Sequence, residues 1–173
     1  MNATLKRPET KESNTYYHKY IGQVASDDFL KELEKAITET VAFLSALDTA
    51  QWNYRYAPGK WSIKEVMLHV LDTERIMAYR ALRIARNDKT PLPGFEQDDY
   101  IPYADAENRS PQSIIEEYKA LRRSTIEMFR HFNDEMLGRL GTASGNPFTP
   151  RALGFVIAGH EIHHLNIVKE RYL

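Results

Sequence analysis

Apolar residues recur at intervals of three and four along much of this chain, the spacing that buries one face of an α-helix. Four stretches show this spacing clearly, at about 27–47, 62–86, 111–134 and 150–173. Nowhere does the chain alternate between apolar and polar residues as a half-buried strand does. The pattern therefore predicts an all-α fold, a four-helix bundle whose helices have roughly 20 residues each.

Local start signals agree with these stretches. Ser62 begins a capping box with Glu65, in which each residue satisfies a backbone N–H group of the other. Ser110 and Thr149 are N-cap residues, and each is followed by a proline, which suits the first helical position. The second, third and fourth helices are thus predicted twice, by their apolar faces and by their caps.

The segment 87–109 between the second and third helices is long for a helix–helix connection. It contains enough apolar residues to pack, so we expect an ordered crossover. Its acidic residues Glu96, Asp98 and Asp99 are most simply solvated charges.

Residues 1–25 are predicted to form an N-terminal arm ahead of a single domain at 26–173. The arm begins with a polar stretch, 1–14, which we expect to be a loose leader. A tyrosine-rich stretch follows at 15–24, and segments of this kind pack as a lid or against a partner surface.

The composition excludes several classes of function. The chain of 173 residues carries 23 Lys and Arg against 24 Asp and Glu and has no long basic run, so nucleic acid is not an expected partner. The absence of cysteine excludes disulfides, a catalytic cysteine and a thiolate metal site. The sequence has neither an apolar run of membrane-spanning length nor a signal-type N-terminus, so we expect a cytoplasmic protein without membrane association.

Two histidines mark the candidate site. His160 and His164 lie one turn apart on the apolar face of the last helix. Burying two imidazoles without partners is costly, and a shared metal ion would satisfy both. His69, near the inner face of the second helix, is the natural third ligand. We therefore expect a divalent transition metal bound by His69, His160 and His164, with water completing its coordination.

Three alternatives compete with this assignment. The segment 160–164 reads H-E-x-x-H, the signature of a metalloprotease with Glu161 as general base, but Glu170 is the only acid or histidine downstream. Glu161 and His164 also match half of a di-iron carboxylate site, although a second E-x-x-H is missing. Finally, His163 could replace His164 as a ligand, yet it projects about 100° away on the helix.

Glu161 and His163 lie between the ligands in sequence but project away from the metal axis. We expect neither to bind the metal, and we predict that they take part in catalysis by managing a proton. In the simpler interpretation, Glu161 only caps a surface pair and His163 only packs. His18 and His131 are expected to be structural or exposed.

Two segments carry a family resemblance, namely Trp61-Ser62-Ile63-Lys64-Glu65 with His69, and Gly159-His160-Glu161-Ile162-His163-His164. In these segments the chain resembles the DinB/YfiT-like superfamily, and the similarity extends over about 26–171. The resemblance implies a four-helix bundle with a long crossover between helices 2 and 3, commonly assembled as a homodimer. It also implies a three-histidine site for zinc or nickel, and the family's ligands correspond to His69, His160 and His164.

The superfamily includes bacillithiol S-transferases, a mycothiol-dependent isomerase and proteins named as metal-dependent hydrolases. The resemblance therefore implies transfer of a low-molecular-weight thiol to an electrophilic small molecule. With no cysteine in the chain, any thiol nucleophile must be a co-substrate. Metal-dependent hydrolysis is the alternative within the enzymes, and a non-catalytic metal-binding stress protein is the alternative outside them.

Overall fold

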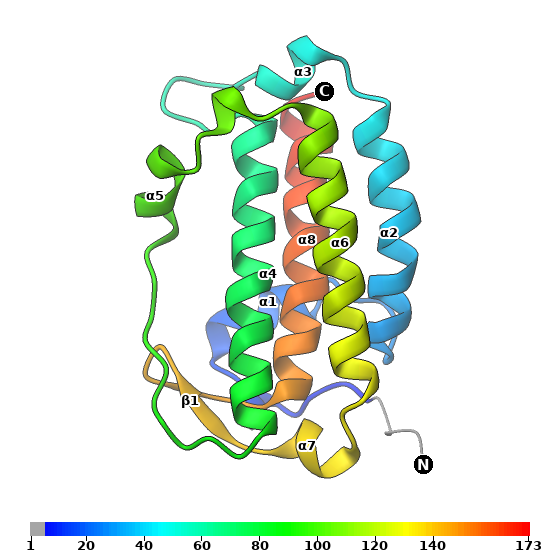
Figure 1. Cartoon of the computed structure of the whole chain (residues 1–173). Helices are drawn as coiled ribbons and strands as arrows, with labels where there is room; N and C mark the ends of the chain where they lie inside the picture. Colours follow the sequence, from blue (N-terminus) through cyan, green and yellow to red (C-terminus); the bar gives the residue numbers. More distant parts are fainter. Residues whose placement is uncertain (1–5) are drawn as a thin grey trace.

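Figure 1 shows the computed structural model of the chain, which describes residues 6–173. Four long helices stand side by side and form the bundle: α2 (Phe29–Ser45), α4 (Ile63–Ala85), α6 (Pro111–Arg130) and α8 (Pro150–Arg171). This arrangement confirms the predicted all-α, four-helix bundle. The cap residues Ser62, Ser110 and Thr149 each accept a hydrogen bond from a backbone N–H of the first turn, so these three helices begin where their sequence signals indicated.

Shorter elements connect the long helices. They are α1 (His18–Ile21), α3 (Thr49–Asn53), α5 (Gln97–Tyr100), α7 (Asp134–Gly138), the 3₁₀ turns Thr10–Glu12, Thr15–Tyr17, Ile101–Tyr103 and Ala106–Asn108, and the strands β1 (Gly141–Ala143) and β2 (Asn146–Phe148). The third helix was expected to reach 134 but ends at Arg130, because Asn133 caps the separate helix α7. The hairpin of β1 and β2 was not predicted, since three-residue strands are too short to show alternation.

The crossover between α4 and α6 is ordered, as predicted. In Figure 1 it climbs along one side of the bundle, from the lower end of α4 to the upper end of α6, and it contains α5. Two backbone hydrogen bonds of Leu92 join the crossover to the hairpin. The N–H of Leu92 donates to Thr142 O at 2.9 Å, and the carbonyl of Leu92 accepts from Ser144 N at 2.9 Å. The crossover and the hairpin are therefore held as one layer beside α4.

The apolar core is divided into two clusters with a polar layer between them. One cluster contains Phe155 of α8 and the other contains Val168. Between these positions α8 carries His160, Glu161 and His164, and the facing helices also place polar side chains at this level. A polar layer within an apolar core is costly unless its members are paired, so it marks a site rather than a packing layer.

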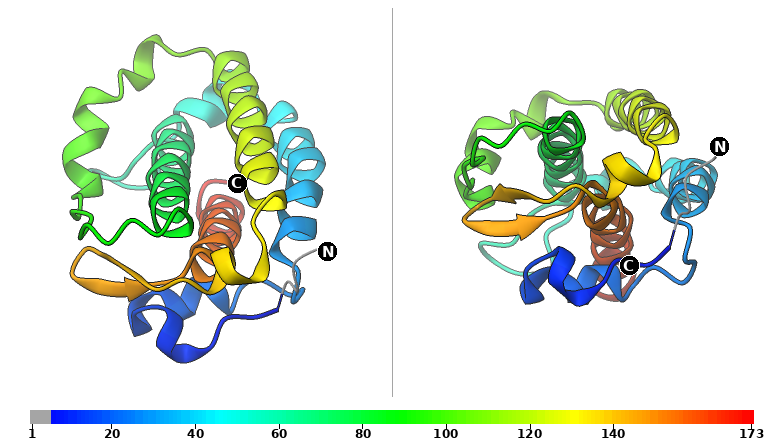
Figure 2. Two further views of the ribbon diagram at one scale, coloured as in Figure 1. Left: turned by 60° about the horizontal axis from the view of Figure 1, so that its bottom comes forward. Right: turned by 90° about the horizontal axis from the view of Figure 1, so that it is seen from below.

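The N-terminal arm packs along α8. Figure 2 shows it crossing the lower end of the molecule beside the start of α8. The guanidinium of Arg7 donates to the carbonyls of Ile21 and Val24 at 2.9 and 2.7 Å, and the buried Glu12 accepts from the Thr149 hydroxyl at 2.7 Å. The prediction of a loose leader is therefore wrong for residues 7–14, because these polar side chains have specific partners. Residues 1–5 of that leader lie outside the described residues.

Burial of α8 differs from the expected single apolar face. From Ala152 to Glu161 every residue is buried, because the arm covers the side that the other long helices leave open. None of the described helices is long and apolar enough to cross a membrane.

Candidate metal centre

Three histidines from two helices converge at the polar layer. The Nε2 atom of His160 lies 3.0 Å from Nε2 of His69 and 3.1 Å from Nε2 of His164. His69 comes from α4 and the other two from adjacent turns of α8. We call these three residues the histidine cluster; they are the three that the sequence singled out.

Hydrogen bonding alone does not satisfy this cluster. A neutral imidazole presents one hydrogen or one lone pair at Nε2, so His160 can pair with only one of its two neighbours there. Zinc–nitrogen bonds of 2.0–2.1 Å place tetrahedral ligand atoms about 3.3 Å apart, close to the observed separations. Among the described residues, this is the group of histidine and acidic side chains whose ligand atoms all lie within 4.8 Å of one another. The residues present therefore fit a bound divalent ion.

Burial keeps the cluster neutral. It lowers the pKa of His69 to about 4, and together with the neighbouring His69 it lowers the pKa of His164 to about 3. The pKa of His160 lies well below its ordinary value, mainly because of burial and then because of His164. Neutral imidazoles are the form that binds metals, so the cluster is in its ligand form at neutral pH.

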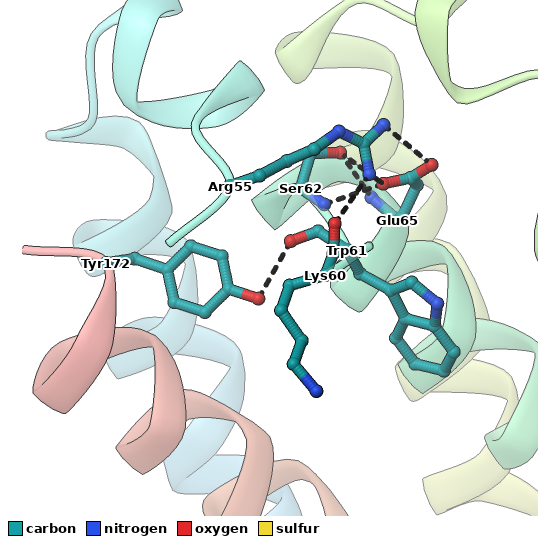
Figure 3. A network of polar contacts seen from close by, with 6 residues as sticks. All are labelled: Arg55, Lys60, Trp61, Ser62, Glu65 and Tyr172. Carbon is teal, nitrogen blue, oxygen red and sulfur yellow. Dashed lines mark hydrogen bonds and ion pairs between the residues drawn. The ribbon is translucent and has the colours of Figure 1, made fainter. Parts of the chain in front are cut away.

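The start of α4 positions His69. In Figure 3, the carboxylate of Glu65 accepts from Ser62 N at 2.6 Å and from the guanidinium of Arg55, which also donates to Lys60 O at 2.9 Å. The hydroxyl of Tyr172 donates to Trp61 O at 2.8 Å. These bonds hold the segment before α4 in place.

Trp61, which this segment carries, has its ring centroid 5.0 Å from that of His69. The motif W-S-x-x-E thus has a physical role here. It fixes a helix start and places an indole beside His69.

The arm covers the other side of the cluster. The ring of Tyr20 lies edge-on to those of His160 and His163, with both centroid distances 5.3 Å. This close approach depends on Gly159, where a β-carbon would stand 1.9 Å from the carbonyl oxygen of Tyr20. The tyrosine-rich segment therefore packs as a lid, one of the two roles expected for it.

Glu161 points away from the cluster into a buried ionic network. Its carboxylate accepts from the hydroxyls of Thr40 at 2.6 Å and Tyr118 at 2.7 Å, and lies 2.6 Å from Nη2 of Arg122. Arg122 also donates to Glu74 at 2.8 Å. Glu161 is 1% exposed, so the interpretation that it caps a surface pair is wrong. One step along a helix turns a side chain by about 100°, which separates this network from the cluster.

The remaining histidines lie outside the cluster. His163 is half-buried beside Tyr20, with its ring 5.1 Å from that of His164. His131 is exposed, in agreement with its predicted surface position, and His18 is half-buried in the arm.

Two cavities reach the cluster, each at a different histidine. One, of about 350 Å³, is lined by His160 and by residues of the arm, the crossover and the hairpin; we call it the His160 cavity. The other, of about 440 Å³, is lined by His164, Trp61 and Tyr172; we call it the His164 cavity.

Asp98 of the crossover lines both cavities. It is exposed, as expected for a solvated charge, but the sequence held no signal that the crossover would bring it beside the histidines.

Comparison with known proteins agrees with this architecture. The sequence profile of the DinB superfamily matches residues 32–168, and the chain belongs to that superfamily. A protein of Oceanobacillus iheyensis, provisionally named a metal-dependent hydrolase, is 23% identical over 144 residues, which cover 82% of each chain. YfiT from Bacillus subtilis, described as a probable metal-dependent hydrolase with an unusual four-helix bundle topology, superposes with a TM-score of 0.65. That match covers 95% of this chain and 91% of YfiT at 17% identity, and it shows a shared fold.

Proposed function

We propose that the protein is a metal-dependent enzyme that binds one divalent transition metal, zinc or nickel, through His69, His160 and His164. The convergence of three neutral Nε2 atoms carries this proposal. The ion would lower the pKa of a coordinated water or thiol, or polarise an electrophile. The chain's own contribution is to hold the imidazoles in place and to cover them with Trp61 and Tyr20.

We further propose that the reaction joins two small molecules, a low-molecular-weight thiol and an electrophile. Two separate cavities reach the cluster, one at His160 and one at His164, which gives each substrate its own space. A chain without cysteine has no thiol of its own to contribute. His163 lies close enough to the cluster to carry a proton, and we keep it in that role.

Hydrolysis is the second candidate, and the names of the two similar proteins favour it. A hydrolase needs one organic substrate and water, so one of the two cavities would then serve only for access. A non-catalytic metal-binding protein would use neither. The homodimer and the cytoplasmic location remain proposals that follow from the family resemblance and from the composition.

The test is turnover by metal-loaded protein of a generic electrophile with a panel of thiols, and of a generic ester without thiol. We expect thiol-dependent loss of the electrophile that disappears in His160→Ala. Ester cleavage without any thiol reaction would instead support the hydrolase. Inactivity on both, with full metal content, would favour the binding protein.

A further inference from the structure

One residue in the wall of the His160 cavity has a buried hydroxyl that lacks a partner. Thr73 stands one turn after His69 on α4, is 4% exposed and lines this cavity. Its Oγ1 has no hydrogen-bond partner within residues 6–173. A buried hydroxyl without a partner destabilises the folded protein. A bound ligand that accepts a hydrogen bond from the Thr73 hydroxyl would remove that cost.

A second hydroxyl reaches the cavity from the tip of the hairpin. Ser144 lines the cavity, and its Oγ accepts from the Nη2 of Arg80 at 3.0 Å. Because the acceptor side of this hydroxyl is engaged by a cation, its own proton is left for another group. Ser144 and Thr73 both line this cavity, and each has a hydroxyl proton that is not donated to another described residue.

Arg80 places a positive charge behind these donors. It is 2% exposed, and its other contacts are Pro93 O at 2.7 Å, Met77 Sδ at 3.5 Å, the hydroxyl of Tyr17 and the ring of Phe95. In the described part of the chain it has no carboxylate within ion-pair distance. Arg122, equally buried, has two, Glu74 and Glu161. Burying an uncompensated charge is expensive, so Arg80 lacks the anion that a buried arginine ordinarily has.

The backbone conformation at Ser144 also favours a binding role for its hydroxyl. Ser144 and Gly145 form the two-residue turn of the hairpin, with φ of 50° and 72°. Such turns favour Asn-Gly or Gly-Gly, and serine in this left-handed conformation is strained. The hydroxyl of Ser144 therefore occupies a position that local turn preference would give to another residue.

We propose that the His160 cavity binds the carboxylate group of an organic substrate, held by the hydroxyls of Thr73 and Ser144 in the field of Arg80. The acidic Glu96 and Asp98 also line this cavity, so a singly charged carboxylate fits better than a dianionic phosphate. The aromatic side chains Tyr16, Tyr17, Tyr20 and Phe95 surround the space and suit an apolar or aromatic body. This inference rests on the proposed function only in naming the bound molecule a substrate.

The experiment measures binding of benzoate, of its neutral isostere benzamide and of inorganic phosphate by calorimetry, in metal-loaded and metal-free protein. We expect benzoate to bind at least tenfold more tightly than benzamide and more tightly than phosphate, with or without metal. Equal binding of benzoate and benzamide, or tighter binding of phosphate, would overturn the assignment. Since neither hydroxyl is a metal ligand, the result is independent of whether the three-histidine site holds its ion, which metal analysis reports separately.

Two variants separate recognition from folding. Thr73→Val and Ser144→Gly should each weaken benzoate binding about tenfold, because a hydrogen bond to a charged group is lost. Thr73→Val should not lower the melting temperature of the free protein, because valine removes an unpaired hydroxyl. Ser144→Gly relieves the positive φ but also removes the hydroxyl that accepts from Arg80, so we expect only a small change in its melting temperature. Thr125→Val is the matched control, since Thr125 is 2% exposed with an unpartnered hydroxyl on α6 but does not line this cavity.

A third comparison tests the charge. Arg80→Met should abolish the preference for benzoate over benzamide, and Arg80→Lys should retain part of it. Benzoate binding that survives Thr73→Val, Ser144→Gly and Arg80→Met but requires the metal would place the carboxylate on the ion and contradict the proposal.

Discussion

The backbone of Tyr20 occupies the space where a side chain on Gly159 would begin. A β-carbon at position 159 would lie 1.9 Å from the Tyr20 carbonyl oxygen and 2.5 Å from its carbonyl carbon. The arm and α8 are thus in backbone contact one residue before His160. This contact brings the Tyr20 ring over the histidines, and it explains a glycine in the middle of an unbroken helix.

The effect of Gly159→Ala on stability tests this contact, because helix propensity and the steric clash predict opposite signs. Helix propensity alone would make alanine stabilising by roughly 0.5–1 kcal/mol. Because the obstruction is backbone rather than a mobile side chain, we expect destabilisation instead, with the arm displaced from α8. Thermal unfolding measures the first effect, and protease sensitivity of residues 15–24 measures the second.

Gly138→Ala is the control for that variant. A β-carbon there would meet only Arg151 at 3.9 Å, an ordinary contact. It should leave the arm protected. A stable Gly159→Ala protein with a protected arm would mean that the arm and helix accommodate a methyl group by a shift that leaves the lid in place.

Periodicity and caps predicted the long helices because both signals are local. The features they missed depend on contacts between distant residues. Glu12 is a polar residue in a polar leader, and only its contacts with Thr149 and Arg151, 137 and 139 residues later, explain its burial. Likewise α8 was assigned one apolar face, although its first half is buried on every side once the arm is in place.

The candidate site, like the fold, contains some residues that the sequence predicted and others that only the tertiary structure reveals. His160 and His164 could be paired from helix geometry, and His69 from its place on the facing helix. Nothing in the sequence pairs Glu161 with Arg122 or brings Asp98 beside the histidines, because α6 and the crossover reach them only through the tertiary fold. The same holds for Thr73, whose relevance comes from the absence of a partner in the described fold.

Removing any one imidazole of the cluster should remove most of the bound metal. Three nitrogen ligands are the minimum protein set of an open zinc-type site, and two retain a divalent ion poorly. We expect about one metal per chain in the wild type and a small fraction of that in His69→Ala, His160→Ala and His164→Ala, measured by elemental analysis. His18→Ala and His131→Ala are controls that should keep full content. Full occupancy in His160→Ala would contradict the assignment.

The metal-free protein should remain folded but become acid-sensitive. Its two apolar clusters provide a core without the ion, so helical circular dichroism should survive chelation at neutral pH. Burial lowers the folded-state pKa of His69 to about 4, whereas an unfolded histidine titrates near 6.5. Below about pH 6.5 the unfolded chain therefore takes up protons before the folded one, and stability falls as pH drops toward 4.

Melting temperatures of chelated protein between pH 7.5 and 4 check this expectation. Replacing a buried histidine should flatten the curve, so His164→Ala should lose less stability on acidification than the wild type. A curve that is flat in the wild type would mean that the cluster is not buried in neutral form.

His163→Gln tests proton transfer without disturbing the fold. The side chain is half-buried, and burial followed by the nearby Lys19 lowers its pKa below the ordinary value. We expect metal content and melting temperature to stay close to those of the wild type. If His163 carries a proton in turnover, activity should fall by roughly 10²–10⁴-fold with an altered pH profile. An unchanged profile would leave it with a packing role beside Tyr20.

Glu161→Gln should lower the stability of the protein without reducing its metal content. The carboxylate compensates the charge of Arg122 and accepts hydrogen bonds from the hydroxyls of Thr40 and Tyr118. An amide keeps the shape, but it removes the charge and turns one acceptor into a donor that faces other donors. We therefore expect a loss of roughly 1–3 kcal/mol in the free energy of unfolding, moderated because Glu74 still pairs with Arg122.

Metal content should remain near that of the wild type in Glu161→Gln, because none of the carboxylate's contacts within the described residues is with the histidine cluster. Denaturant unfolding and elemental analysis on the same preparation give both values. Loss of metal comparable with that in His164→Ala would make Glu161 a ligand and revive the di-iron interpretation. If the folded variant instead kept its metal but lost activity with a shifted pH profile, Glu161 would take the acid–base role that its place between the two ligands first suggested.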